Sequence, residues 1–271
     1  MPQRCLRQQR HLLSTLGDAA VGVLLTGAAR AKAAAATRVA GDWLAGLLAA
    51  ECAAVVPGRP ARPSMPVLFD PARMPKRGKG GTPASRVALL HAVAHIELNA
   101  IDLAFDLVAR FGAVMPRAFL DDWVRIGGEE ALHFGLLADR LEALGSHYGA
   151  LPAHDGLWLA ATATAHDLLA RLAVVPLVLE ARGLDVTPDM IVRLERGGDS
   201  ESAGILRRIF ADEIGHVAAG SRWFHAVAAD SGFDPESAFK LAVATHFRGL
   251  VKPPFNDSAR EQAGLPPGFY R

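Results

Sequence analysis

One pattern of glutamate and histidine occurs twice in the sequence and constrains the fold more than any other feature. In each copy a glutamate is followed 33 residues later by a second glutamate, which begins a Glu-x-x-His motif. The two copies are Glu97, Glu130 and His133, and Glu180, Glu213 and His216. Residues three apart on a helix share a face, so each motif directs a carboxylate and an imidazole to one point. The equal spacing predicts that each copy spans a helical hairpin.

The neighbours of these glutamates at helical spacing are apolar or small. They are Leu90, Val93, Ala94, Ile101 and Ala104; Trp123, Ile126, Gly127, Phe134 and Leu137; Leu169, Leu172, Ala173 and Leu177; and Leu206, Ile209, Phe210 and Val217. Such faces belong in a core, where an unpaired carboxylate costs several kcal/mol. With no Lys or Arg on these faces, a bound cation is the natural partner. Carboxylate and imidazole ligands in a six-residue site predict two iron ions, with manganese or a mixed iron–manganese pair as alternatives.

Two further acids compete for the ligand role, because Glu129 and Asp212 each lie four residues before a motif histidine. The equal 33-residue spacing favours the glutamate that follows each of them. The two acids then either hold the histidines in place or are solvated, and solvation is slightly favoured. His91 and His225 lie one or two turns from predicted ligands, and for them a place in the core or beside the ligands is expected rather than catalysis.

Long stretches rich in alanine and leucine, with few glycines or prolines, predict an all-α protein. Residues 1–56 form an N-terminal helical extension, 57–83 an arm rich in proline and basic residues, and 84–271 a helical bundle with a tail. The four long helices of this bundle are expected at about 84–111, 117–145, 156–183 and 199–231. A short helix is expected at 188–196, an extra C-terminal helix from Asp234, and an irregular chain from residue 253 onward.

The helix at 84–111 carries a polar stripe on the side opposite its predicted ligand. The stripe consists of His95, Asn99, Asp102 and Asp106, and the basic residues of the arm are Arg59, Arg62, Arg73, Lys76, Arg77 and Lys79. In one interpretation the stripe faces solvent. In the other the arm wraps around the helices and binds the stripe through charge-assisted hydrogen bonds.

Charge and cysteine content exclude several classes of protein. The 29 basic and 28 acidic residues leave a net charge of +1, so the whole molecule has no bias toward nucleic acid or anionic membranes. Two cysteines, Cys5 and Cys52, provide neither a disulfide framework nor a thiolate zinc site. A reduced, cytoplasmic protein is expected, without a membrane span of roughly 20 apolar residues.

Four segments of the chain resemble a bacterial family called domain of unknown function 455. They are His91-Ala-Val-Ala-His-Ile-Glu-Leu-Asn-Ala-Ile-Asp102, Glu129-Glu-Ala-Leu-His-Phe134, Asp212-Glu-Ile-Gly-His216 and Lys252-Pro-Pro-Phe-Asn256. The pattern is also similar to the wider ferritin-like di-iron superfamily. The resemblance extends from about residue 10 to the tail. It implies a ferritin-like four-helix bundle and the six metal ligands named above, and little about the substrate.

Three di-metal chemistries occur on such a scaffold. Iron storage requires a short subunit that packs into a cage, which the arm and tail would obstruct. Radical generation requires a tyrosine near the metals, whereas Tyr148 is expected in a loop and Tyr270 lies at the end of the chain. An oxidase or hydroxylase that activates O₂ toward an organic substrate therefore leads, and its catalytic residues beyond the ligands are unknown.

Small residues near the ligands give modest support to a substrate pocket. Gly127, Gly128, Gly215 and Gly220 lie within a few turns of the ligands and each costs up to about 1 kcal/mol in a helix. Pro176 removes a helical hydrogen bond one turn before Glu180. These residues either leave space for a substrate or permit close contacts between helices.

The partners expected of such an enzyme are O₂, a small or medium-sized organic substrate and, for an oxygenase, an electron donor. A tRNA-modifying hydroxylase is one alternative, although Phe69 is the only aromatic residue in the basic arm and base stacking requires more. A non-enzymatic, ferroxidase-like protein that binds or handles iron is another. A homodimer is a further expectation.

Overall fold

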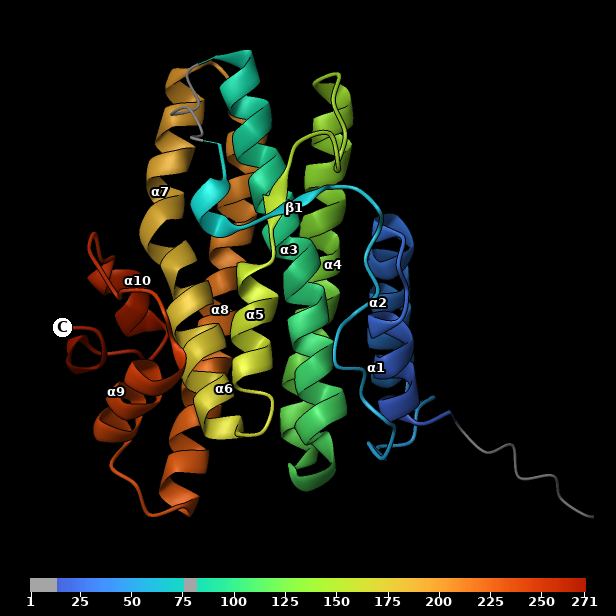
Figure 1. Ribbon diagram of the computed structural model, residues 1–271, viewed down its shortest axis with the longest axis vertical. Coiled ribbons are helices and arrows are strands. Elements are labelled where there is room, and N and C mark those ends of the chain that lie inside the picture. Colours follow the sequence, from blue (N-terminus) through green and yellow to red (C-terminus); the bar gives the residue numbers. More distant parts are fainter. Residues whose placement is uncertain (1–13, 76–81) are drawn as a thin grey trace, which may run out of the picture.

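The computed structural model describes residues 14–75 and 82–271, and their regular structure is almost entirely helical (Figure 1). The predicted all-α class is confirmed. The α-helices are α1 (Leu16–Leu24), α2 (Ala29–Leu44), α3 (Pro83–Phe111), α4 (Arg117–Ala143), α5 (Gly156–Ala163), α6 (Leu168–Val174), α7 (Ala181–Arg196), α8 (Ser200–Asp230), α9 (Pro235–His246) and α10 (Asp257–Gln262). Short 3₁₀ turns are η1 (Pro71–Arg73), η2 (Gly112–Val114) and η4 (Pro267–Phe269), and η3 (Val175–Glu180) is a π-helical segment. Strand β1 (Leu68–Phe69) pairs in parallel with β2 (Ala153–His154).

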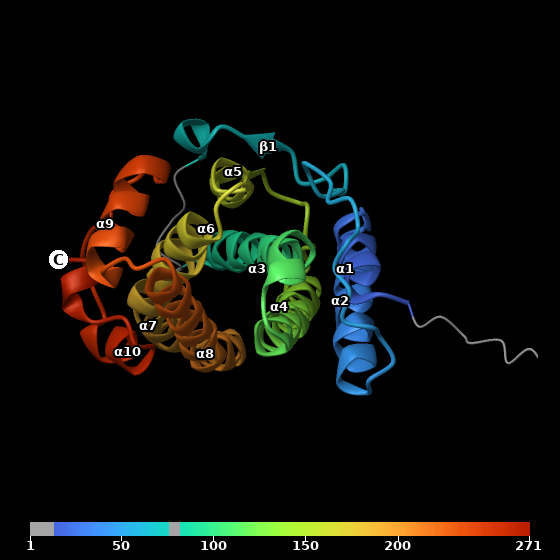
Figure 2. The ribbon, with the colours of Figure 1, turned by 90° about the horizontal axis from the view of Figure 1, so that it is seen from below.

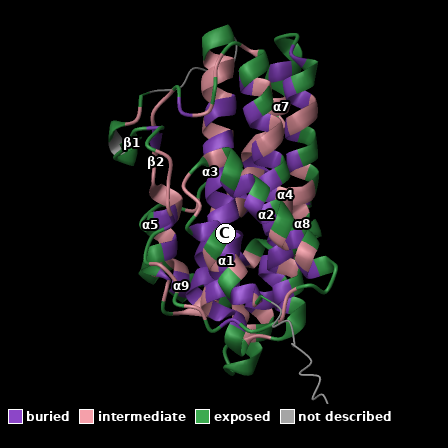
Figure 3. Cartoon of the chain, turned by 90° about the vertical axis from the view of Figure 1, so that its right-hand side faces the viewer, coloured by how far each residue is buried: buried purple, intermediate pink, exposed green. Residues whose placement is uncertain are grey.

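Four helical stretches run side by side through the centre of the molecule. Helix α3 packs along α4, and α7 packs along α8, so the chain forms two hairpins. The two hairpins meet where α4 packs on α8, and α6 and η3 also pack on α8 (Figure 2). The inward faces of these helices are buried and the outward faces are exposed (Figure 3). The predicted helices at 84–111, 117–145 and 199–231 agree with α3, α4 and α8 to within a few residues.

The third predicted helix is divided, and the separate short helix is wrong. Helix α5 ends at Ala163, and α6 continues through the π-helical segment directly into α7. Pro176 lies in that segment, where its missing N–H prevents regular α-helical bonding. Helix α7 runs without a break through Pro188. Pro188 has no N–H to donate to the Leu184 carbonyl. The Asn256 side chain donates to this carbonyl instead, at 3.1 Å.

The tail is more ordered than the sequence predicted. Helix α9 begins where expected, with Asp234 as its N-cap, but α10 and η4 follow in a segment expected to be irregular. Arg260 is buried and binds Asp185 of α7 through two hydrogen bonds of 2.7 and 2.8 Å. Tyr270 packs over the Arg260 guanidinium at 4.4 Å. The tail is therefore anchored to the helix that follows Glu180.

The N-terminal extension contains two helices, as predicted. Helix α1 packs on α3, and α2 packs on α4. Trp43 near the end of α2 is buried and donates from its indole nitrogen to Asp121 of α4 at 2.8 Å. The start of the predicted helical region, residues 9–13, lies outside the described residues, as does Cys5. Cys52 is a free, buried thiol.

The polar stripe of α3 is buried, so the solvated interpretation is wrong. Arg62 of the arm donates to Asn99 at 2.7 Å and lies 3.1 Å from Asp102. Asp102 also pairs with Lys32 of α2, and neither of these two side chains is exposed to solvent. The arm therefore wraps around the helices as predicted, and a buried lysine unforeseen in the sequence completes its anchor. Lys76, Arg77 and Lys79 lie outside the described residues.

A second buried ion cluster joins α3 to α6. Asp106 is fully buried and pairs with Arg171 of α6, which is 1% exposed, and with Arg110 one turn later at 2.7 Å. Arg171 also donates to Thr164 at 2.9 Å, at the break between α5 and α6. The last residue of the stripe thus fixes the start of the divided third helix.

The composition of α3 reflects its central position. The stretch Pro83–Val114 is long and apolar enough to cross a membrane by those criteria alone, but 72% of its most apolar window is buried inside the protein. Packing against α1 and α4 accounts for this hydropathy.

The Asp106–Arg171 pair provides a test of the fold. Replacing Asp106 with Asn leaves a buried guanidinium that cannot lose its proton, so the free energy of unfolding should fall by about 3–5 kcal/mol. The control is Asp139→Asn, which removes one partner of the exposed Arg30 and should cost no more than about 1 kcal/mol. Urea denaturation followed by circular dichroism measures both, and equal losses would contradict a buried role for Asp106.

Candidate metal centre

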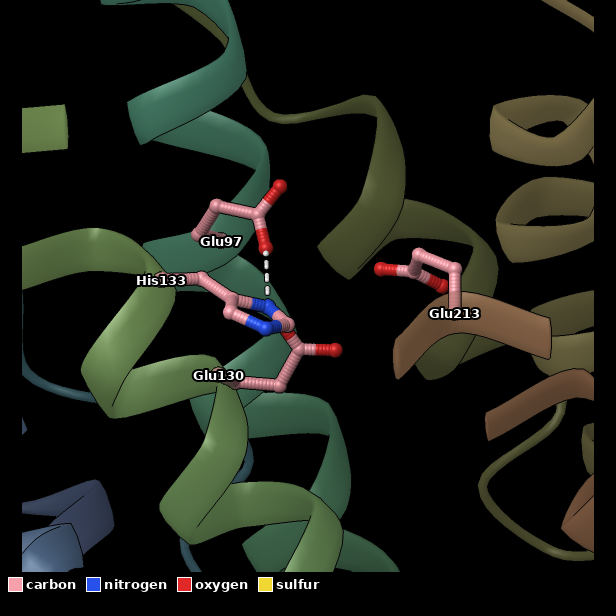
Figure 4. Close-up of side chains that lie close together, drawn as sticks. All are labelled: Glu97, Glu130, His133 and Glu213. Atoms are coloured by element: carbon pink, nitrogen blue, oxygen red, sulfur yellow. Dashed lines mark hydrogen bonds and ion pairs between the residues drawn. The ribbon is translucent and has the colours of Figure 1, made fainter. Parts of the chain in front are cut away.

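The structure brings residues of both sequence copies together between the two hairpins. Glu97 comes from α3, Glu130 and His133 from α4, and Glu213 from α8, and these four side chains point toward one another (Figure 4). Each of the four offers a ligand atom, and these atoms all lie within 4.8 Å of one another. This cluster could therefore hold a metal ion.

The two remaining predicted residues border this group. Glu180 ends the π-helical segment, and His216 lies one turn after Glu213 on α8. The His133 and His216 rings are 5.8 Å apart. Glu130 connects them, because its Oε2 atom lies 3.3 Å from His133 Nδ1 and its Oε1 atom 3.0 Å from His216 Nδ1. The Nδ1 atoms of both histidines therefore face the carboxylates.

The opposite nitrogen of each histidine is bound by an acid from the other sequence copy. His133 Nε2 lies 3.0 Å from the Asp212 carboxylate, and His216 Nε2 lies 2.8 Å from the Glu129 carboxylate. Both acids therefore contact histidines instead of being simply solvated, and their role in orienting these histidines toward a metal ion stays a prediction. A carboxylate that accepts a hydrogen bond from Nε2–H of a neutral imidazole leaves the Nδ1 lone pair available to a metal ion.

Each of these acids is itself held by an arginine one turn earlier. Arg125 donates to Glu129 at 2.6 Å, and Arg208 donates to Asp212 at 2.6 Å. Burial alone would raise the pKa of both acids, but the adjacent histidine and arginine lower it below its ordinary value. Both acids therefore remain ionised and can accept from the imidazoles.

The sequence pattern contained a signal for this arrangement. Arg125 and Glu129 precede Glu130 at the same positions at which Arg208 and Asp212 precede Glu213. Every residue of the second copy lies 83 residues after its counterpart, for example 208 − 125 = 83. The repeat therefore includes the arginines, which the search for metal ligands left out.

Burial and mutual repulsion oppose ionisation of the cluster when no cation is present. Burial raises the pKa of Glu97 to about 8 and that of Glu180 to about 7, and the negative charge of Glu130 adds to both shifts. The pKa of Glu213 rises for the same two reasons. Glu130 behaves oppositely, because His216 and His133 outweigh burial and lower its pKa. The cluster thus shares a few protons in place of cations.

Four atoms of the cluster are buried without a hydrogen bond among the described residues. They are Glu130 Oε1, Glu180 Oε2, Glu213 Oε2 and His216 Nδ1. The first and last of these lie 3.0 Å apart as an ion pair, but not in hydrogen-bonding geometry. Buried polar atoms normally have partners, and each one left unsatisfied costs about 1–3 kcal/mol. All four are metal-ligand atom types, so the side chains present fit a bound cation.

The structure does not bring the other two candidate histidines to the cluster. His91 accepts a hydrogen bond from the Gly149 amide at 2.9 Å, on another face of α3. The His225 ring packs against Phe224 and Phe269. Both residues support packing at a distance from the predicted ligands.

Most of the small residues near the ligands permit close helix packing. A Cβ atom added at Gly127, Gly128 or Gly220 would lie 2.6, 2.9 or 2.4 Å from a side-chain atom of Phe105, Ala40 or Pro176, respectively. A Cβ atom at Gly215 would meet nothing within 4 Å. The packing interpretation is therefore correct for three of the four glycines, and these three leave no pocket.

Comparison with known proteins gives two matches. The family described as "Protein of unknown function (DUF455)" matches residues 25–271. A Haemophilus influenzae protein that carries the name "Uncharacterized protein" is 42% identical over 211 residues, which cover 76% of this chain and 73% of the relative. No solved structure matches the chain.

The raised pKa values predict how the stability of the metal-free protein depends on pH. The Glu97 pKa is about 8 in the folded protein against an ordinary 4.5. Burial alone would lower the pKa of His133, but its hydrogen bonds to the Glu130 and Glu97 carboxylates raise it to about 12 against 6.5. At a pH between the unfolded and the folded pKa of either group, the folded protein holds a proton that the unfolded chain has released. Stability therefore falls as pH rises from 6 to 8.5, by about 1.4 kcal/mol per pH unit for each such proton.

Urea denaturation of chelator-treated protein measures this dependence. The Glu97→Gln variant should show a shallower decline, because one of the titrating groups is gone. Metal-loaded protein should show the opposite trend, since metal ligands must be deprotonated and metal affinity rises with pH. Stability of the metal-free protein that increases over this range would contradict the proton count.

Proposed function

The chain belongs to the DUF455 family. From the arrangement of its glutamate and histidine side chains, we propose that it is a di-iron carboxylate protein that activates O₂ to oxidise an organic substrate. One observation carries the proposal. Two half-sites of identical spacing meet around Glu130, and the histidine of each is held by an acid of the other. Two glutamates together with two Glu-x-x-His motifs are typical of ferritin-like di-iron proteins with four helices.

Charge balance supports two ions rather than one. The six proposed ligands are Glu97, Glu130, His133, Glu180, Glu213 and His216. Their four carboxylates together carry four negative charges, which two divalent cations neutralise. A single divalent ion would leave two negative charges uncompensated in an apolar core, at a cost of several kcal/mol per charge. The two oxygens of Glu130 face different histidines, which suits a ligand shared between the ions.

The chain's contribution to the chemistry is to fix and shield the ligands. Bound iron would supply the Lewis acidity and the electrons that oxygen activation requires. Glu129 and Asp212 hold each imidazole in the tautomer that exposes Nδ1. Trp123 and Phe134 on α4 are buried and exclude water from its inner side. The ligand set is equally suited to manganese and to a mixed pair, so metal analysis decides between them.

Iron handling without an organic substrate is the second candidate. Glu180 and Glu213 are only partly buried. The second half-site therefore lies nearer to solvent than the first, where Glu97, Glu130 and His133 are buried. Free Fe²⁺ could approach from this side.

The tRNA-modifying alternative stays a prediction. Two of the six basic residues of the arm have partners within the protein, because Arg62 binds Asn99 and Asp102, and Arg59 binds Asp155. Lys76, Arg77 and Lys79 lie outside the described residues, and the proposal is built on the carboxylate cluster alone.

Metal content tests the centre directly. Purified protein reconstituted with Fe²⁺ should bind two ions per chain by elemental analysis. Replacing Glu97 or Glu180 with Gln should lower this number, and Asp212→Asn should weaken binding about 10–100-fold by releasing His133. Glu142→Gln on the exposed end of α4 is the control and should retain both ions. Fewer than two ions in the unaltered protein, or full occupancy in both ligand variants, would refute the dinuclear centre.

Oxygen consumption separates the two functions. Reduced, iron-loaded protein of an oxidase should consume about one O₂ per centre and then stop without a substrate. An iron-handling protein should continue to consume O₂ while free Fe²⁺ is supplied and should release Fe³⁺. Oxygen electrode traces with and without excess Fe²⁺ distinguish these outcomes, and continued turnover of iron would overturn the oxidase proposal.

A further inference from the structure

A cavity of about 380 Å³ lies on the side of α3 away from the carboxylate cluster. Helix α3 forms one wall, and the arm, the β2 segment and the start of α5 form the others; the cover of β1 and α5 over α3 is visible in Figure 2. None of the six proposed metal ligands lines it. The volume falls within the range of about 300–1,000 Å³ that is typical of small-molecule sites.

His91 presents an unused hydrogen-bond donor at this cavity. Its ring is 1% exposed and lines the wall. Its Nε2 atom accepts a hydrogen bond of 2.9 Å from the Gly149 amide, so the proton of the neutral ring must be on Nδ1. Burial lowers the pKa of His91 to about 4, which keeps the ring neutral. Among the described residues nothing accepts from Nδ1, and this atom is accessible from the cavity rather than sealed away from solvent.

The other polar side chains of the wall are engaged elsewhere. His95 donates from Nε2 to the His154 carbonyl at 3.0 Å and accepts from the Tyr148 hydroxyl at 2.8 Å. Thr82 and Ser85 bond each other in the capping box of α3. His91 Nδ1 is therefore the donor on the α3 wall that is left for an acceptor atom of a ligand.

The rest of the described lining is mostly apolar. It includes Met74, Ala88, Ala92, Ile96, Leu151 and Leu157. His154 also lines the cavity, and its Nδ1 atom accepts from the Gly156 amide at 3.2 Å. An apolar ligand would gain by leaving water, and one acceptor atom would satisfy the His91 donor.

We propose that this cavity binds a small, largely apolar molecule whose carbonyl or similar oxygen accepts a hydrogen bond from His91 Nδ1. Helix α3 separates the molecule from the metal ligands, so the site does not depend on the proposed oxidase function. The Tyr148 ring stacks on His91 at 5.4 Å and meets Phe134, the residue after His133, at 5.2 Å. Two successive ring contacts, from His91 to Tyr148 and from Tyr148 to Phe134, thus link this cavity to the residue next to His133.

The experiment uses a ketone and a hydrocarbon of similar shape as probes. 4-Phenylbutan-2-one carries one carbonyl, and butylbenzene carries none. Both are titrated into the full-length protein and followed by ligand-observed NMR. Ala88→Phe and Ala92→Phe fill the cavity from α3 and should weaken both probes at least ten-fold. Ala34→Phe on the exposed face of α2 is the control and should change neither.

Two substitutions test the donor itself. His91→Gln retains an acceptor near the Gly149 amide but removes the donor at the Nδ1 position, so the ketone should bind about five-fold more weakly and the hydrocarbon equally well. His91→Asn places an amide N–H near Nδ1 and should retain ketone binding. Absence of ketone binding to the unaltered protein, or binding unaffected by both cavity-filling changes, overturns the site. An equal effect of the Gln variant on both probes overturns the role of His91.

Discussion

The arrangement of the whole core follows from placing four carboxylates in one apolar interior. Glu97, Glu130, Glu180 and Glu213 repel one another, and burial disfavours the charge of each. Such a cluster is tolerable only if protons or cations offset its negative charge and its geometry is fixed from outside. The outer framework meets the second condition, because the acid–arginine pairs fix the histidines and the buried ion clusters of α3 anchor the arm and α6.

Much of this was predictable from the sequence, because it depends on local periodicity. The helices that carry Glu97 and Glu130 were predicted to within a few residues. The apolar faces around these two glutamates predicted that their side chains point into the core. The motif histidines were identified for the same reason, since residues three apart on a helix must share a face. Their assignment as ligands remains a prediction, and the structure adds that the donor atoms converge.

Other features depend on contacts between distant residues and left no local signal. A break was expected between the helices at 156–183 and 188–196, but Asn256 replaces the hydrogen bond that Pro188 lacks from 68 residues away (256 − 188 = 68), and the helix is continuous. Asp102 was recognised as polar, yet its burial depended on Lys32 in a helix 70 residues earlier. The role of Glu129 required knowing that His216 lies across the core. Each error followed from treating a residue with its sequence neighbours alone.

The crossed support of the two histidines has a consequence for the origin of the fold. A single hairpin of this design would carry an acid with no histidine to hold and a histidine with no acid beside it. Two identical hairpins related by a twofold axis would satisfy each other completely. The 83-residue repeat is the spacing that a symmetrical pair of hairpins would leave behind if it were fused into one chain.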